Sequence, residues 1–540
     1  MATHNQRSRV AILLVAILLG HMALAWQARA RGIFTFGDDA AYLLLSRALR
    51  AFSYREAQFI GEPIAARFPP GYPTLLALVG VFGEHLKLIT AVGIAISASG
   101  LIALFDVIRR RWSEQIALLV VAVVAVNPSV VSNAGAIASE TLFGSLTLWS
   151  LWGADRTDQG ERRGVFTGIT AIAAALTRSA GVTLPLALGA HWLLRRRFRL
   201  LAIMALASAM TVGAWLAWTT FAPHREVRRS YIDDAVAIRS GDGSMIGTVT
   251  HRVTTNASVY AGQTVPDELH LPMTKRTRLD NVAWLVALGT LALAGIISAW
   301  RRWNAAVVFA ATYGALLLAW AFTLERFVQP LLPLIIAFII IGAWTLGQRV
   351  SSSGRWGVWL SGIIGTLLAT TALVADESLV ANGLACDRSR VDCAPPASLD
   401  YVDASLYAAT HTPATARFVA PKNATLYYFA PRKSTFWDEV IVQDSASFLP
   451  FLERNGVRYL LTTPIYSDQF TLARLGLIHC REFDLVRAFS PETLILVRRD
   501  SPSGPDTPAC RALTRAAARA AANTDVGDYG LKSFRPVLLP

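Results

Sequence analysis

The chain has 540 residues, of which 53% are hydrophobic and only 16% are charged, and its mean hydropathy is +0.41. Soluble globular proteins have about 25% charged residues, so this composition excludes a wholly soluble protein and favours an integral membrane protein with a modest soluble part. The net charge of +14 does not indicate nucleic-acid binding, because the arginines form short clusters between apolar runs rather than one basic face.

Apolar runs recur along the first 376 residues, and most approach the length that a bilayer crossing needs. We predict eleven transmembrane helices, so the predicted fold class is a polytopic α-helical membrane protein. The predicted spans lie near 10–28, 87–108, 114–133, 138–154, 164–178, 180–194, 199–221, 281–300, 303–322, 327–347 and 356–376.

Arginine clusters between the spans predict the orientation. With eleven spans the clusters all fall on one side, which the positive-inside rule makes the cytoplasm of a plasma (inner) membrane. One missed or extra span would move every later cluster to the other side, so the clusters support the count. They are Arg7 and Arg9, Arg109 to Arg111, Arg162 and Arg163, Arg195 to Arg197 with Arg199, Arg301 and Arg302, and Arg349 with Arg355.

The first apolar run has a second interpretation. Its basic start, apolar core and the small-residue stretch ALAWQARA are also typical of a cleavable signal peptide. A retained anchor supplies the first crossing that the later clusters require, so we expect residues 10–28 to remain as a span.

Three segments are then predicted to be extracytoplasmic: the loops 29–86 and 222–279, and the domain 377–540. All four cysteines lie in that domain, as expected for an oxidising compartment. Closeness in the sequence favours a bridge between Cys386 and Cys393, which leaves Cys480 with Cys510, although spacing alone leaves other pairings open. The pairing prediction is therefore Cys386–Cys393 and Cys480–Cys510.

The segment 377–540 is predicted to be a small α/β or α+β domain. TARFVAPKNATLYYFAPRKSTFW contains two β-type runs broken by prolines, and FLPFLERNGVRYLLTTP reads as a helix, a glycine turn and a buried strand. TLILVRR is a further strand, and the Ala- and Arg-rich stretch near 511–523 predicts a surface helix before a poorly ordered end.

Two adjacent carboxylates, Asp38 and Asp39, follow the first span and precede an amphipathic run. Apolar residues from Tyr42 to Phe52 recur at helical spacing, which predicts a helix lying in the membrane interface. A helix cap with one solvated aspartate is the simplest interpretation. The alternative is a cavity with both carboxylates at its rim, because RFPPGYPTLLALVGVFG, which begins at Arg67, turns the loop sharply back to the membrane.

The order of these motifs resembles the GT-C superfamily of membrane glycosyltransferases. By pattern the nearest members are the protein O-mannosyltransferases and the bacterial transferases that add aminoarabinose or galacturonic acid to lipid A. The shared features are an Asp-acidic-x-x-Tyr motif at Asp38, a surface helix and a Pro-rich turn. Further matches are ASETLFGSLTLWSLW with Glu140, LTRSAGVTLPLALGAHWLLRRR with Arg178, and ERFVQPLLPLI with Arg326.

The resemblance covers roughly residues 10–350. Eleven spans fit the mannosyltransferases better than the lipid A enzymes, which have more, and the chain departs from the relatives in two motifs. The relatives usually have Asp-Glu where this chain has Asp38 and Asp39. The lipid A enzymes carry a lysine at the turn, where this chain has only the nearby, unaligned Arg67. The acceptor is therefore left open between lipid, glycan and protein.

The resemblance implies inverting transfer of a sugar from a polyprenyl-phosphate donor on the extracytoplasmic side, by a transmembrane module 1–376. Inverting transfer needs a base for the acceptor hydroxyl, and Asp38 matches the family's catalytic position. Asp39 would position the acceptor or raise the pKa of Asp38. The leaving phosphate needs cationic partners. The candidate substrate-binding residues are Glu140, Arg178, Arg326, Arg67 and Tyr42.

Each of these residues also has a purely structural interpretation. Arg178 could extend to the interface, Arg326 could pair with Glu325, Glu140 could cap its span, and Tyr42 could only pack. Glu84 and His85 are weak candidates for a divalent metal site, since no ligand spacing supports one, and no cofactor is predicted with certainty. The loop 222–279 could close over the donor; its polar residues are Arg225, Arg228, Arg229, Tyr231, Asp233 and Asp234.

A polytopic transporter or lipid flippase without glycosyl transfer is the alternative function, and a catalytically inactive protein of the same fold is another. Transporters place ionisable residues at the bilayer midplane, next to paired broken helices. In this sequence Asp, Glu, Lys and Arg are nearly absent from the centres of the predicted spans. The candidate residues lie at outer span ends, which favours interfacial chemistry on a lipid-borne substrate.

The eleven-span topology predicts where the C-terminus lies. A reporter that fluoresces only in the cytoplasm should stay dark when fused after Pro540, because an odd number of spans places that end outside. The same reporter fused after Arg111 should fluoresce and serves as the control. A bright fusion after Pro540 would contradict the topology and the placement of Asp38 outside.

Overall fold

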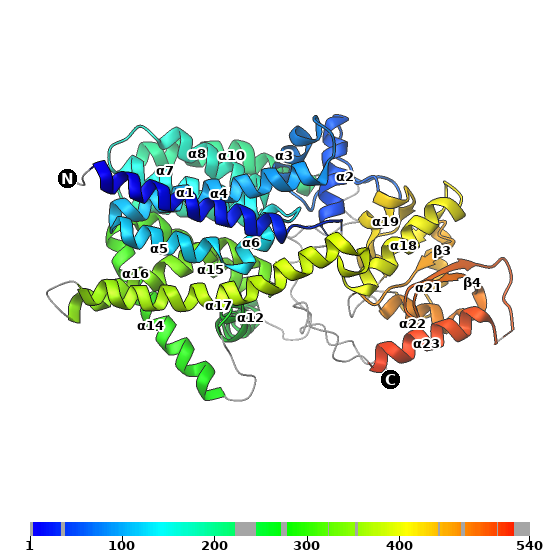
Figure 1. Ribbon diagram of the computed structural model, residues 1–540. Coiled ribbons are helices and arrows are strands. Elements are labelled where there is room, and N and C mark those ends of the chain that lie inside the picture. Colours follow the sequence, from blue (N-terminus) through cyan, green and yellow to red (C-terminus); the bar gives the residue numbers. More distant parts are fainter. Residues whose placement is uncertain are drawn as a thin grey trace.

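Long helices run side by side through most of this computed structural model, and a part that contains the strands lies at one end of them (Figure 1). Six described helices are long and apolar enough to cross a membrane, so the chain is a multi-pass membrane protein. The structure describes residues 4–33, 38–221, 245–271, 278–321, 323–350, 355–440, 443–465, 470–504 and 506–522. The six helices are α1 (His4–Gln27), α4 (Leu86–Arg111), α10 (Phe198–Phe221), α14 (Arg278–Arg302), α16 (Leu332–Val350) and α17 (Arg355–Arg388).

A bent pair of helices replaces the single span predicted at 114–133. Helices α5 (Glu114–Ala125) and α6 (Pro128–Ala134) meet at 66°. Asn127 causes the break, because its side-chain oxygen accepts hydrogen bonds from the backbone N–H groups of Ser129 and Val130 and so starts a new helix. Proline at the next position suits the first turn of that helix.

The remaining predicted spans coincide with shorter or less apolar helices. Each of the eleven predicted runs contains helix, but length and composition select only six of the described helices, or seven with the bent pair. The count of eleven therefore stays a prediction. The shorter or less apolar helices are α7 (Ser139–Asp158), α8 (Gly164–Thr177), η1 (Ser179–Val182) with α9 (Thr183–Leu194), and α15 (Asn304–Ala319).

Helix α1 is packed into the bundle rather than standing apart from it. Its His21 is fully buried, and its two ring nitrogens lie 2.8 Å from the carbonyl of Ala125 and 2.9 Å from the hydroxyl of Ser97. A buried polar side chain with both nitrogens hydrogen-bonded to neighbouring helices supports a retained span rather than a cleaved signal peptide.

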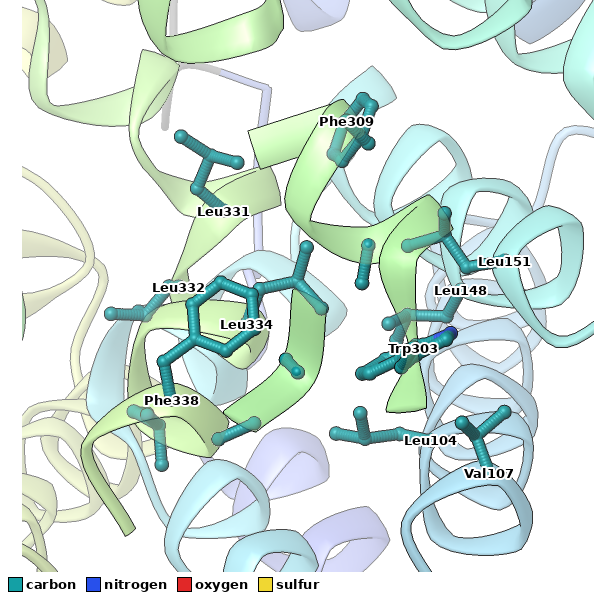
Figure 2. Close-up of a cluster of buried hydrophobic side chains, with 14 of the residues drawn as sticks. Leu104, Val107, Leu148, Leu151, Trp303, Phe309, Leu331, Leu332, Leu334 and Phe338 are labelled. Carbon is teal, nitrogen blue, oxygen red and sulfur yellow. The ribbon is translucent and has the colours of Figure 1, made fainter. Parts of the chain in front are cut away.

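Figure 2 shows a part of the bundle core in which side chains of α4, α7, α15 and α16 come together. Leu104, Leu151, Phe309 and Phe338 meet there, each at most 3% exposed. Between helices in a bilayer, such contacts stabilise mainly through close packing. This core holds the ends of α7 and α16 in fixed positions, and the residues discussed below lie at those ends.

Helix α2 (Asp39–Arg50) lies across the ends of the long helices (Figure 1). The helix itself was expected from the sequence, but its exposure differs from that of an interfacial helix. All residues from Asp39 to Ser46 are buried. The reason is tertiary: α3 (Gly71–Gly80) and the distant α19 (Asn423–Phe429) both pack against α2.

The C-terminal part contains a mixed five-stranded sheet with the order β2-β1-β3-β5-β4. The first three strands are parallel neighbours, whereas β5 is antiparallel to β3 and β4. The strands are β1 (Arg417–Val419), β2 (Lys433–Ser434), β3 (Tyr459–Leu461), β4 (Phe483–Ala488) and β5 (Leu494–Arg498). The helices around them are α18 (Pro396–His411), α19, α20 (Trp437–Val440), α21 (Phe448–Arg454), α22 (Phe470–Ile478) and α23 (Pro508–Ala522).

The sequence predicted several of these elements correctly. The helix, the turn at Gly456 and the strand β3 follow one another as expected, and β5 and α23 are present. The stretch TARFVAPKNATLYYFAPRKSTFW contains two strands, β1 and β2, but the apolar TLYYFA between them forms α19. A short apolar run does not distinguish a strand from a buried helix turn, and here contact with α2 selects the helix. The predicted end after α23 lies outside the described residues.

The predicted boundary at 376/377 falls inside a helix, because α17 continues without a break from Arg355 to Arg388. The C-terminal part also binds back to the loop after α2. Ser434 of β2 donates its backbone N–H to Gln58 and accepts one from Ile60, and Lys433 lies 2.6 Å from Glu62.

The structure joins Cys386 to Cys393 and Cys480 to Cys510. Their sequence separations are 7 and 30 residues. In the chain-entropy description, the bridge that closes the longer loop stabilises the protein more, by about 1 kcal/mol.

We therefore expect all four cysteines to resist alkylation in folded, oxidised protein until a reductant is added. Thermal unfolding in detergent should show a larger loss for the double variant Cys480→Ser/Cys510→Ser than for Cys386→Ser/Cys393→Ser. Free thiols in the untreated protein would contradict the bridges.

Candidate active site

Asp38 and Arg326 form an ion pair at the start of α2. Arg326 Nη1 donates to Asp38 Oδ2 at 2.6 Å. Asp38 occupies the N-cap position of α2, but its side chain makes no capping hydrogen bond. The simple interpretation of Asp38 as a helix cap is therefore wrong, because its carboxylate turns to a cation from a distant part of the chain.

Arg326 reaches Asp38 from a pair of short 3-10 turns that precede α16. These turns are η4 (Glu325–Phe327) and η5 (Gln329–Leu331); Pro330 in η5 has no N–H with which to continue a helix that begins at η4. The Tyr313 hydroxyl of α15 donates to the Phe327 carbonyl at 3.0 Å and so holds η4 in place. Arg326 therefore pairs with Asp38, whereas the structural alternative from the sequence was a pair with its neighbour Glu325.

Glu140 and Arg178 form a second ion pair beside the first. The Arg178 guanidinium contacts the Glu140 carboxylate and donates to the Ser139 hydroxyl at 3.1 Å. Their side chains are 12% and 5% exposed, for Arg178 and Glu140 respectively. Arg178 therefore does not extend to the interface. Glu140 does not cap α7, whose N-cap is Ala138.

The two ion pairs are neighbours. Arg326 Nε lies 4.0 Å from Glu140 Oε1, and the Phe327 ring centre is 5.9 Å from the guanidinium carbon of each arginine. The Tyr42 hydroxyl lies 3.0 Å from that of Ser139, while its ring contacts Phe68 and Tyr72. Tyr42 therefore both packs and belongs to the polar network, which combines the two interpretations offered by the sequence.

The structure separates the two adjacent aspartates. Asp38 lines a pocket, whereas Asp39 is 2% exposed and its Oδ1 accepts a hydrogen bond from the backbone N–H of Ala40 at 2.8 Å. Neither is the fully solvated carboxylate of the capping interpretation. Of the two aspartates, only Asp38 lines this pocket.

Together, the nearby cations lower the pKa of Asp38 by more than burial raises it. Burial by itself raises the pKa of the Asp38 carboxyl, but the charge and hydrogen bond of Arg326 lower it, and the charges of Arg67 and Lys422 add to that effect. The pKa of Asp38 is therefore held below its usual value, and the group is a carboxylate at neutral pH. Lys422 comes from the loop before α19, and no sequence signal connected it with Asp38.

The pocket at Asp38 has a polar end and an apolar wall. It encloses about 600 Å³ of space between atoms, including its open mouth. Asp38, Arg178 and Arg326 lie at the polar end. The apolar wall is formed by Leu316, Leu317 and Trp320 near the end of α15, with Phe68, Pro69 and Phe327.

Glu84 forms ion pairs with arginine side chains. Its carboxylate pairs with Arg47 and Arg50, and Arg47 in turn lies over the Tyr428 ring of α19 at 4.6 Å. Within the described part of the chain no three His, Cys, Asp or Glu side chains are grouped as metal ligands need. The structure therefore gives Glu84 and His85 no support as a metal site.

Part of the proposed closing loop can be described. It forms α12 (Met245–Val259), a π turn (Tyr260–Thr264) and α13 (Val265–Glu268). Asn256 donates to the carbonyls of Leu317, Leu318 and Trp320 and so caps the end of α15 that forms the pocket wall. The residues Arg225, Arg228, Arg229, Tyr231, Asp233 and Asp234 lie outside the described residues.

Removing Glu140 should destabilise the protein strongly. Glu140→Ala leaves the Arg178 guanidinium buried without its carboxylate, and breaking a buried pair from one side costs about 3–5 kcal/mol. The matched control is Glu62→Ala, whose pair with Lys433 is 40–45% exposed, so its loss should cost about 1 kcal/mol or less. Thermal unfolding of both variants in detergent measures the difference. Equal midpoints would show that the Glu140–Arg178 pair does not stabilise the fold.

No family model matches the sequence, and no curated protein matches it either. Solved structures do match the fold. ArnT from Cupriavidus metallidurans bound to undecaprenyl phosphate aligns with a TM-score of 0.56 and 15% identity, over 92% of this chain and 99% of ArnT. An Archaeoglobus fulgidus oligosaccharyltransferase complex with Zn and sulfate aligns with a TM-score of 0.53 and 12% identity, over 86% of this chain and 71% of that chain.

The A. fulgidus oligosaccharyltransferase AglB in complex with an inhibitory peptide and a dolichol-phosphate gives a TM-score of 0.51 at 12% identity, over 93% of this chain and 77% of that one. At these identities the likeness shows the fold alone, and activity has to be argued from the site. The chain shares the fold of the GT-C membrane glycosyltransferases, as the resemblance in its sequence implied.

Proposed function

We propose that this chain is a membrane glycosyltransferase that moves a sugar from a polyprenyl-phosphate donor to an acceptor hydroxyl, with inversion at the anomeric carbon. One observation carries the proposal. A single pocket joins a carboxylate, Asp38, and two guanidinium groups, Arg178 and Arg326, to an apolar wall at the end of α15. A carboxylate serves as a base, guanidinium groups bind phosphate, and an apolar wall accepts a prenyl chain.

The charges at the pocket fit a phosphodiester. Its lining holds two guanidinium groups, those of Arg178 and Arg326, against one carboxylate, that of Asp38. The charges of Arg67 and Lys422 also act on Asp38. A polyprenyl-phosphate sugar carries one negative charge at its phosphodiester, and the surplus of cations in the lining favours its binding.

The reaction balances with these groups. The acceptor oxygen attacks the anomeric carbon of the donor while Asp38 takes the hydroxyl proton. The bond from the anomeric carbon to the phosphate oxygen breaks, and its electron pair leaves with the polyprenyl phosphate. Arg326 and Arg178 stabilise the charge that develops on the phosphate. Attack from the side opposite the leaving group inverts the configuration.

The related folds support the kind of ligand. ArnT was solved with undecaprenyl phosphate, and AglB with a dolichol-phosphate and an inhibitory peptide. Both lipids are polyprenyl phosphates, which supports the proposed kind of donor. We keep a lipid, a glycan and a protein as acceptor classes for this chain.

We also propose the sidedness and the division of the chain. The helical module 1–376 and the domain 377–540, linked by the continuous α17, would form one extracytoplasmic site in a plasma (inner) membrane. Arginine clusters place the opposite ends of the spans in the cytoplasm. Because nucleotide sugars are cytoplasmic, an outward-facing site requires a sugar that a lipid has carried across.

The position of the charged groups disfavours a transporter. The Asp38, Glu140, Arg178 and Arg326 cluster lies at one end of the helices, whereas a transporter needs ionisable groups at the midplane. Another cluster in the described part of the chain, Asp106 with Arg109, Arg110 and Arg156, lies at the opposite ends of α4 and α7, where a structural role suffices.

Asp38→Asn should abolish most transfer while the fold survives. The amide keeps the shape but cannot take the proton, and loss of a positioned base typically lowers a rate about 100- to 10,000-fold. The measurement is the lipid extract of a strain without this protein, in which a polyprenyl-phosphate sugar should accumulate. Wild-type protein should remove that lipid and Asp38→Asn should not.

The matched control is Asp387→Asn. Asp387 is also paired with an arginine, Arg31, but it lies at the end of α17 outside the pocket, so this variant should remove the lipid like the wild type. Normal removal by Asp38→Asn would refute the assignment of the base. If no polyprenyl-phosphate sugar accumulates in the strain, the proposed donor is wrong.

A further inference from the structure

We propose that Arg326 is a shared cation that neutralises Asp38 before the donor binds and moves to the donor phosphate on binding, which releases Asp38 to act as the base. The inference rests on the proposed function, since it takes a polyprenyl phosphate as the ligand. It adds a coupling within the site: the donor itself unmasks the catalytic carboxylate. Donor binding would then have to precede proton transfer from the acceptor.

Geometry puts Arg326 within reach of both partners. Its Nη1 is bound to Asp38 at 2.6 Å, and its Nε is 4.0 Å from Glu140. Asp38 and Arg326 both line the pocket and are 28% and 27% exposed, so a ligand can reach both members of the pair. A guanidinium group binds carboxylate and phosphate with the same forked geometry, so the phosphate can replace the carboxylate directly.

The other arginine of the pocket is held in place. Arg178 contacts the Glu140 carboxylate and donates to Ser139, and both members of the Arg178–Glu140 pair are nearly buried. Separating a buried pair is costly, whereas partly exposed pairs exchange at low cost. Arg326 is therefore the mobile cation, and Arg178 with Glu140 forms the fixed wall against which it moves.

The ion pair with Arg326 disfavours proton transfer to Asp38. With Arg326 bound, the pKa of the Asp38 carboxyl lies below its usual value, which makes the carboxylate a weak base. Moving the guanidinium group to the phosphate removes the largest of the interactions that lower this pKa. The carboxylate gains basicity when the anomeric carbon is in place, and not before.

After each transfer Arg326 returns from the phosphate to Asp38. Asp38 takes the acceptor proton as the bond between the anomeric carbon and the phosphate oxygen breaks, and Arg326 stays with the phosphate as its charge rises. Asp38 then passes its proton to water. The restored carboxylate competes with the product phosphate for Arg326, and re-forming the Asp38–Arg326 pair assists release of the polyprenyl phosphate.

Competition for one cation predicts that removing the carboxylate tightens lipid binding. The experiment measures the affinity of undecaprenyl phosphate for the full chain in lipid nanodiscs, for wild type, Asp38→Asn, Arg326→Gln and the double variant. Asp38→Asn should bind the lipid roughly 3- to 10-fold more tightly and release it more slowly, because Arg326 is no longer shared. Arg326→Gln should bind it more weakly than wild type.

The double variant separates sharing from a general change of charge. If the carboxylate acts through Arg326, Asp38→Asn should no longer tighten binding in the Arg326→Gln background. Equal tightening in both backgrounds would overturn the proposal, as would unchanged or weaker binding by Asp38→Asn alone. Size-exclusion profiles check that each variant is folded, and Arg326→Lys replaces Arg326→Gln if the latter aggregates, with a reduced coupling expected because an ammonium group lacks the fork.

A control and the activity assay keep the two proposals distinguishable. Asp387→Asn removes an arginine-paired carboxylate outside the pocket and should leave the affinity unchanged. If wild-type protein removes the donor lipid but Asp38→Asn does not tighten binding, only the shared cation is refuted. If wild type binds no undecaprenyl phosphate and removes no donor lipid, the proposed function falls, and this inference with it.

Discussion

The ion pair between Asp38 and Arg326 joins residues 288 positions apart and forms part of the polar end of the pocket. One partner sits at the start of α2 and the other in the turns before α16, so the pair places the start of the crossing helix beside the bundle. Together with Glu140 and Arg178 it forms a group in which charges of opposite sign alternate. At the end of a helical bundle, where apolar surroundings strengthen electrostatic interactions, such an alternation lets several charges lie close together.

The C-terminal part completes this site rather than standing apart from it. Helix α19 covers α2, and Lys422 at its start adds positive charge near Asp38. Strand β2 binds the loop after α2 through backbone hydrogen bonds, and the Phe59 and Phe436 rings stack at 4.0 Å beside it. A change in how this part docks would therefore alter the electrostatics of the pocket, which gives the part a role beyond stability.

The fold of this protein and its proposed function rest on different observations. The fold is shared with ArnT and AglB at 12–15% identity, but a shared fold hosts different chemistries. The proposed glycosyl transfer rests instead on the pocket, where a carboxylate, two guanidinium groups and an apolar wall meet. The pairing of Asp38 with Arg326 also shows why position matters more than residue type: Asp39 is the same residue one place along, yet it is buried outside the pocket.

The sequence by itself determined the features that depend on local composition. Apolar runs predicted where helices form, and the order of the motifs singled out Asp38, Glu140, Arg178 and Arg326, which the structure brings together. Tertiary structure decided the rest: TLYYFA became a helix, α2 became buried, and Lys422 came close to Asp38. The periodicity and composition of a segment show which of its faces is apolar, but not which other segment covers that face. Here the covering segments lie hundreds of positions away in the chain, so only the tertiary structure identifies them.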